Sequence, residues 1–204
     1  MFKKMLLLLS FMALLPMQGF AHEQGPLPVV QTAVGGVIDA LKAREDQSSL
    51  SSTDREAIRK AIDGYFDFGE MAKRALGKPW KKMAREQKKE FVAVFRELLE
   101  LSYGNRLADY HDQKVEYGKV KIGKRTAIVN SEVIDAEKRT PVRYKLVNKK
   151  SGWRVYDIKV EGISMISTYR TDFRAAVNKD GIDGFLDSLK KRVAGLKTQD
   201  QSKS

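Results

Sequence analysis

The sequence contains no cysteine and only two histidines in 204 residues. Without disulfides, the hydrophobic interior alone has to hold the fold together. Thiolate metal ligands are absent, the histidines do not form an HExxH spacing, and no phosphate-binding loop occurs. These absences exclude a disulfide scaffold, the common zinc sites and ATP hydrolysis. We expect no cofactor, and the chain has few groups that could perform catalysis.

Long hydrophobic runs are also missing, except at the N-terminus. Two lysines there precede an apolar run from Met5 to Leu15, a helix breaker at Pro16 and the small residue Ala21. The run is too short to cross about 30 Å of hydrocarbon, so residues 1–21 are predicted to be a signal peptide cleaved after Ala21. With no cysteine for lipid attachment, we expect a freely diffusing exported protein.

Positive charge dominates the composition, with 38 Lys and Arg against 26 Asp and Glu and a net charge of +12. Loss of Lys3 and Lys4 with the signal peptide leaves +10. Such a chain often binds nucleic acid, but export removes that partner and leaves acidic head groups or the acidic faces of exported proteins. The predicted organisation is a single domain over 22–197 and a polar tail over 198–204.

Amphipathic helices are predicted in the first half of the chain. Thr53 and Glu56, and later Asp67 and Glu70, stand at capping-box spacing, and Gly77 predicts the end of a helix that begins at Phe68. Apolar residues at helical spacing predict helices over 28–42, 53–65, 68–76 and 85–110.

After His111 the repeat of apolar residues changes from every 3.6 residues, typical of a helix, to every second residue, typical of a strand. Short turns at Gly123, near Lys138 and at Ser151 and Gly152 predict an antiparallel meander, because parallel strands need long crossovers. Helices on either side of a four-stranded or slightly larger sheet make the fold class α+β. The predicted strands are 114–122, 124–136, 139–150 and 152–162, and two further helices are predicted over 163–177 and 182–193.

Three residues are candidates for chemistry. His111 ends a helix, where the helix dipole favours it. Ser164 either caps the following helix or belongs to an incomplete nucleophile elbow. Asp157 lies within an apolar strand, where a carboxylate needs a partner. Either it forms a structural ion pair with Arg170 or Arg143, or it acts as a general base in a pocket.

Two separated motifs carry a resemblance to a known family. The segments YFDFGEMAKRALGKPW (65–80) and WRVYDIKVEGISMISTYRTDF (153–173) resemble the MlaC family, the periplasmic phospholipid carriers also called the toluene-tolerance family. The likeness spans about residues 28–195. One departure is KMAR at 82–85, where the family often has a Thr-Pro or Ser-Pro helix opening.

The resemblance implies a fold similar to NTF2-like domains, in which a curved antiparallel sheet and its helices enclose an apolar cavity. It implies a phospholipid ligand and two partners: an outer-membrane lipoprotein bound to a porin, and an inner-membrane ABC transporter with its substrate-binding ring. The function would be to shuttle diacyl lipids between those complexes. The alternative is a small-molecule enzyme on a similar scaffold, with Asp157 as its base.

A lipid carrier needs more apolar lining than its own packing requires. For any one of these residues a filled core is an equally good interpretation. The candidates for the cavity are Val34, Ile38, Ile62, Phe66, Phe68, Met71, Phe91, Phe95, Leu98, Tyr103, Val129, Val133, Val142, Tyr144, Leu146, Val155 and Ile163.

Basic clusters are candidates for attracting a lipid head group or an acidic docking surface. A solvated charged face is the alternative for each residue. The candidates are Lys78, Lys81, Lys82, Arg85, Arg139, Arg143 and Lys145, with Lys88 and Lys89 beside the first group.

Overall fold

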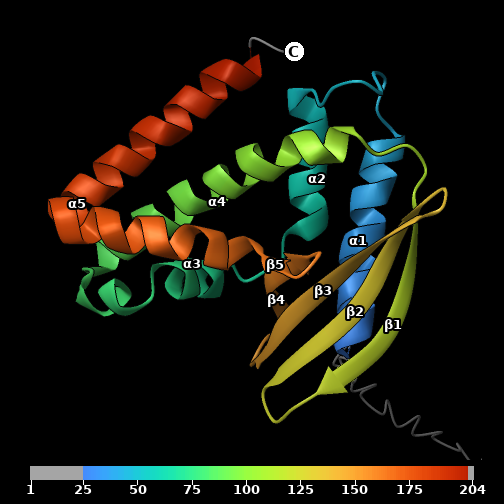
Figure 1. Cartoon of the computed structure of the whole chain (residues 1–204), viewed down its shortest axis with the longest axis horizontal. Helices are drawn as coiled ribbons and strands as arrows, with labels where there is room; N and C mark the ends of the chain where they lie inside the picture. Colours follow the sequence, from blue (N-terminus) through green and yellow to red (C-terminus); the bar gives the residue numbers. More distant parts are fainter. Residues whose placement is uncertain (1–24, 202–204) are drawn as a thin grey trace, which may run out of the picture.

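The computed structural model describes residues 25–201 (Figure 1). The predicted signal peptide lies outside these residues. Helices precede and follow one antiparallel sheet, so the α+β fold class is confirmed. The elements are α1 (Pro26–Lys42), α2 (Ser52–Ile62), α3 (Phe68–Leu76), the 3-10 helix η1 (Lys78–Lys82), α4 (Arg85–Ala108), β1 (Lys114–Ile122), β2 (Thr126–Asp135), β3 (Lys138–Lys149), β4 (Gly152–Val160), β5 (Ile163–Ser164) and α5 (Met165–Gln201).

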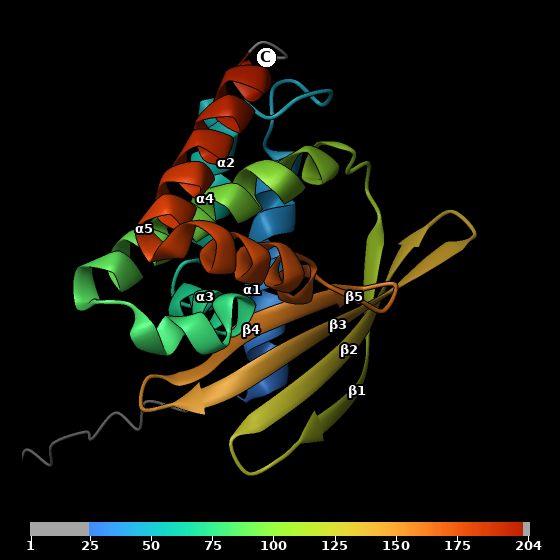
Figure 2. The same ribbon diagram turned by 60° about the vertical axis from the view of Figure 1, so that its left-hand side comes forward.

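The sheet is the meander that the sequence predicts. Its strands pair antiparallel in chain order from β1 to β5, and the two-residue β5 extends the four predicted strands. Gly152 adopts a φ of 90° at the tight turn between β3 and β4, a conformation that favours glycine. The sheet is curved, as Figure 2 shows.

The two faces of the sheet have different neighbours. We call the face that packs on α1 the inner face and the opposite one the outer face. In Figure 1, α1 runs along the sheet while α3, α4 and α5 gather beyond β4. β4 contacts α1 on its inner face and α3 and α5 on its outer face, so it is covered on both sides. This explains why Val155, Tyr156 and Asp157 are all buried in succession.

A β-bulge in β4 makes this double coverage possible. Leu146 pairs with Val155, but the next residue of β3, Lys145, pairs with Asp157, so Tyr156 is an extra residue. The Tyr156 ring joins the helices, and the Arg74 guanidinium lies 4.0 Å from its centroid. The bulge therefore moves Asp157 to the outer face, opposite Lys145.

Helix α3 begins and ends where the sequence predicts, but its cap is simpler. The Asp67 carboxylate accepts a hydrogen bond from the Glu70 backbone N–H at 2.8 Å, and Gly77 follows the helix with a φ of 72°. The reciprocal half of the predicted capping box is absent, because the Asp67 N–H donates to the Val155 carbonyl of β4 instead. The Glu70 carboxylate pairs with Arg74.

Helix α2 begins earlier than predicted. Ser51 and Asp54 form its capping box, and the predicted box of Thr53 and Glu56 is wrong. Both pairs have the required spacing, but the earlier pair adds more than half a turn of hydrogen-bonded helix.

The last two predicted helices meet at a kink. Gly181, with a φ of 70° and a ψ of −175°, separates two helical halves of α5. The second half continues to Gln201, and Asp200 pairs with Arg55 of α2 at 2.6 Å. Helix α5 therefore extends into the predicted polar tail as far as Gln201, because this ion pair holds the last turn against α2.

Candidate functional site

The buried apolar residues form two clusters rather than one lining. The helical cluster joins α3, α4 and α5, and the α1–sheet cluster joins α1 to the inner face of the sheet. Phe66 packs against both and pairs with Val155 through an isolated β-bridge. The predicted cavity residues are therefore divided between two layers.

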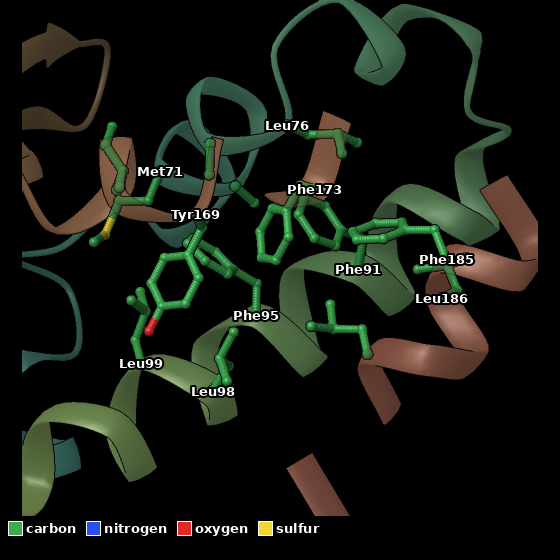
Figure 3. Packing of buried hydrophobic residues seen from close by; sticks show 14 of the residues in the cluster. Met71, Leu76, Phe91, Phe95, Leu98, Leu99, Tyr169, Phe173, Phe185 and Leu186 are labelled. Carbon is green, nitrogen blue, oxygen red and sulfur yellow. The ribbon is translucent and has the colours of Figure 1, made fainter. Parts of the chain in front are cut away.

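The helical cluster is a filled aromatic core (Figure 3). Phe91 lies with its ring centroid 5.6 Å from Phe95, 5.7 Å from Phe173 and 5.5 Å from Phe185. Phe95 and Tyr169 meet edge to face at 5.5 Å. Such mutual contacts favour a filled core at these positions. A place for Phe91 and Phe95 in a cavity lining stays a prediction. Buried in the same cluster are Met71 and Leu98, with Phe68 and Tyr103 packed against it.

The α1–sheet cluster has a different composition. It consists mainly of short aliphatic side chains, and among residues 25–201 no aromatic ring pair lies within it. Such side chains separate at less cost than interlocked rings, because each contributes little contact area. Five predicted cavity residues are buried here, namely Val129, Val142, Tyr144, Leu146 and Val155, with Val34 and Val133 packed against them.

Three predicted cavity residues belong to neither cluster. Ile38 and Ile62 are half-buried. Ile163 is 69% exposed, so its predicted place in the lining is wrong. It begins β5 directly after Gly162, whose φ of 84° turns the chain tightly and leaves the Ile163 side chain at the tip of the hairpin.

Helix α1 is fixed at its C-terminal end. Arg44, which is 4% exposed, donates to the carbonyls of Leu41, Ala108 and Tyr110 at 2.8, 3.1 and 3.1 Å, and so joins this end of α1 to the end of α4. A Cβ on Gly36 would lie 3.1 Å from the Ala61 Cβ, so α1 and α2 pack closely at this position.

The N-terminal half of α1 is held differently. It touches the sheet through apolar residues such as Val29 and Val30. Within the described part of the chain, no hydrogen bond or ion pair connects α1 to the strands. α1 is therefore fixed at one end and held only by apolar contacts along the sheet.

Hydroxyl groups interrupt the apolar inner face. Ser131 of β2 is 4% exposed and pairs in register with Tyr117 of β1. The Tyr144 phenol of β3 lies close to Ser131, and burial raises the pKa of Tyr144 to about 12. Burial also raises the pKa of Tyr117. All three hydroxyls therefore stay protonated at neutral pH.

The buried carboxylate of Asp157 forms a structural network on the outer face. Its oxygens lie 3.1 Å from the Lys145 Nζ and accept from the Ser164 hydroxyl at 2.8 and 2.9 Å. The Ser164 Oγ in turn accepts from the Ser167 N–H, so the predicted cap of α5 is confirmed. The predicted pair of Asp157 with Arg170 is wrong, because the bulge brings Lys145 opposite the carboxylate. The Arg170 Nε donates to the Arg74 carbonyl.

The predicted basic residues separate into two groups. Arg139 pairs with Glu116 and Glu132 at 3.0 and 2.9 Å, and Arg143 donates to Asn130 at 3.1 Å. Lys145 pairs with Asp157, so both Arg139 and Lys145 have carboxylate partners, and their use for anionic ligands stays a prediction.

The other basic group lies on η1 and at the start of α4, and none of its residues belongs to the sheet. Its residues are exposed, and among residues 25–201 none of them pairs with a carboxylate. They remain available to an acidic surface. They are Lys78, Lys81, Lys82 and Arg85.

Comparisons with known proteins agree with this architecture. The model of the family described as MlaC protein matches residues 31–191. The chain belongs to the MlaC family. Across residues 25–201 there is no group of three or more His, Cys, Asp or Glu that could hold a metal, and no helix is long and apolar enough to cross a membrane.

Individual relatives cover nearly the whole of this MlaC-family chain. It is 25% identical over 201 residues to the intermembrane phospholipid transport system binding protein MlaC of Haemophilus influenzae, with 94% of each chain covered. It is 28% identical over 196 residues to the toluene tolerance protein ttg2D of Pseudomonas putida, covering 93% of this chain and 91% of that one.

A solved structure supports the same relationship. The phospholipid-binding protein from Ralstonia solanacearum, determined in complex with a phospholipid, matches with a TM-score of 0.79 and 25% sequence identity. The match covers 85% of this chain and 99% of that one. The arrangement of sheet and helices is thus shared with a protein that holds a phospholipid.

Proposed function

We propose that this chain is an exported carrier that moves diacyl phospholipids across the periplasm, between an outer-membrane lipoprotein–porin complex and an inner-membrane ABC transporter complex. The observation that supports it most directly is the match, over 85% of this chain and 99% of the other, to a protein solved with a phospholipid bound. The names of the H. influenzae and P. putida relatives support the same pathway.

The acyl chains enter between α1 and the inner face of the sheet. A diacyl lipid has on the order of 30 methylenes, and exposing each one to water costs about 0.8 kcal/mol. A carrier therefore has to offset a free-energy cost of more than about 20 kcal/mol by keeping the chains away from water. Only enclosure between two apolar layers achieves this. α1 suits the moving layer, because Arg44 fixes one end and the rest is held by apolar contacts.

The interlocked rings of the helical cluster have a complementary role. They hold α3, α4 and α5 as a rigid body next to β4, so that separation of α1 from the sheet does not unfold the domain. The boundary between the two clusters lies at Phe66, which contacts both.

An enzyme based on Asp157 is not favoured. A general base has to reach its substrate, and this side chain is 1% exposed with both oxygens engaged by Lys145 and Ser164. The carboxylate ties β3 and β4 to the start of α5, which is a structural role.

Native mass spectrometry of the purified protein tests the carrier function. We expect diacyl phospholipid to co-purify with it or to be taken up from liposomes. Protein that remains free of lipid under both conditions would contradict the proposal.

A pair of matched substitutions tests where the acyl chains lie. Ala127→Leu adds volume to the inner face, and Ala75→Leu adds the same volume to the helical cluster; the two residues are 2% and 0% exposed. Overpacking destabilises both variants by roughly 1–3 kcal/mol. Only Ala127→Leu is expected to lose bound lipid, and equal lipid loss in both variants would argue against a site at the α1–sheet cluster.

The basic residues around η1 are proposed to dock the acidic surface of a partner complex. Reversing Lys81 and Lys82 to Glu should slow lipid delivery to the partner most at low salt, because salt screens exposed charges. The matched control is the reversal of Lys121, near the end of β1, and Lys124, in the turn between β1 and β2, which lie on another part of the molecule. Equal slowing by both reversals would indicate a general effect of net charge.

A further inference from the structure

The three hydroxyls of the inner face form a row across adjacent strands. Tyr117 of β1 pairs with Ser131 of β2. Tyr144 of β3 pairs with Val129, which is two residues before Ser131 on β2 and on the same face, so Tyr144 is the diagonal neighbour of Ser131. Tyr144 is buried, Ser131 is buried, and Tyr117 on the edge strand is half-buried. The row therefore leads from the interior of the α1–sheet cluster to the free edge of the sheet.

The hydroxyls of the row have few hydrogen-bond partners in the protein chain. Each hydroxyl carries one O–H, and among the described residues none of the three donates to a carboxylate or a backbone carbonyl. The Tyr144 phenol and the Ser131 hydroxyl can satisfy only one donor between them. The Ser131 Oγ is the one buried side-chain polar atom of residues 25–201 that has no well-formed hydrogen bond. The Ser131 O–H therefore lies in an apolar layer without an acceptor from the described residues.

A buried donor without an acceptor is costly, so its retention points to an acceptor that the protein chain does not supply. The charge of the surroundings limits what that acceptor is. β2 contains no Lys or Arg, and the strand register places Arg139, Arg143 and Lys145 of β3 on the outer face. The one cation of these two strands with inner-face register is Lys138, which is exposed at the start of β3, and the facing residues of α1 are apolar. An anionic phosphate would be buried there without a counter-charge. A neutral carbonyl oxygen would accept the free O–H without that cost.

We propose that Tyr117, Ser131 and Tyr144 form a donor site for the ester carbonyl of an acyl chain. This rests on the proposed function, and it specifies the substrate class as ester-linked lipids. The hydroxyls fix how far the chains enter: the ester group sits at the row, the methylenes lie among the aliphatic side chains, and the phosphate stays toward the solvent beyond half-buried Tyr117.

Competition between ester and ether lipids tests the site. Dioleoyl phosphatidylglycerol and its dioleyl ether analogue share the head group and chains, but the ether lacks the carbonyl. Both are offered in equal amounts in mixed vesicles to the purified protein, and the bound ratio is measured by mass spectrometry. We expect the ester lipid to be preferred by about 2- to 12-fold, which corresponds to one net hydrogen bond.

Two variants locate this preference. Ser131→Ala removes the free hydroxyl, and Tyr144→Phe removes its neighbour without changing the shape of the ring. Each should move the bound ratio toward one while lipid is still taken up. The control Ser188→Ala, at an exposed position of α5, should keep the wild-type ratio.

The outcomes separate the two proposals. Uptake of neither lipid by the wild-type protein refutes the carrier function, and the ester site with it. Equal uptake of ester and ether lipid refutes the ester site alone and leaves the carrier function standing. A preference that persists unchanged in both Ser131→Ala and Tyr144→Phe also refutes it, because the discrimination would then arise elsewhere.

Discussion

Removal of the charge on Asp157 tests the structural network on the outer face of β4. Asp157→Asn keeps the shape of the side chain and an oxygen for the Ser164 hydroxyl, but it leaves the Lys145 ammonium without a counter-charge. At 3.1 Å and an effective dielectric constant of about 20, the attraction is about 5 kcal/mol before desolvation is subtracted. The Lys145 side chain is 28% exposed and can turn to water, which reduces the loss.

We therefore expect Asp157→Asn to lower the free energy of unfolding by about 2–3 kcal/mol. For a domain of this size, this corresponds to a fall in Tm of roughly 5–10 °C. The assay is urea denaturation followed by circular dichroism, on protein stripped of lipid, because a bound ligand would itself raise the stability.

The partner substitution gives the sharper comparison. Lys145→Met leaves a carboxylate that is 2% exposed without its cation, so it should cost more, about 3–5 kcal/mol. The double variant should recover more than about 1 kcal/mol relative to the sum of the two single variants. Additive effects, or wild-type stability in Asp157→Asn, would refute the structural role of the pair.

Two further predictions concern Arg44 and Tyr144. Arg44→Ala removes hydrogen bonds to three backbone carbonyls. We expect the free energy of unfolding in urea to fall by about 2–4 kcal/mol and lipid exchange to become faster. A fall below about 1 kcal/mol would show that α1 is fixed by other contacts. Tyr144 ionises near pH 10 when unfolded and at about 12 when folded, so its contribution is complete below pH 10 and is lost as the pH rises toward 12, by about 1.4 kcal/mol per unit. Tyr144→Phe should flatten this part of the stability curve, and an unchanged slope would contradict the assignment.

Local patterns in the sequence determined most of the fold. The change in apolar period after His111 predicts the meander, and Asp67 and Gly77 bound α3 within a residue. These signals are readable because they depend on neighbours a few residues apart. The α2 start was missed because two equally spaced pairs compete there, and the last turn of α5 because its partner, Arg55, lies on a distant helix.

The candidate site was predictable only in part. Of the seventeen apolar residues that the sequence offers for a cavity, nine are buried and seven are half-buried, but the sequence does not say which layer each one joins. Phe95 and Val129 have the same burial, yet one interlocks with rings and the other faces α1. That difference arises from contacts between segments far apart along the chain.

The bulge at Tyr156 is a feature that the local sequence does not predict. Counting back from the turn at Gly152 with regular pairing would place Asp157 opposite Tyr144, on the apolar inner face. One extra residue shifts the register, so Asp157 lies opposite Lys145 and its carboxylate reaches a cation and the Ser164 hydroxyl. The sequence by itself determined that a buried carboxylate needs a partner. Only the tertiary structure decided which partner, because covering β4 on both faces requires the bulge that selects it.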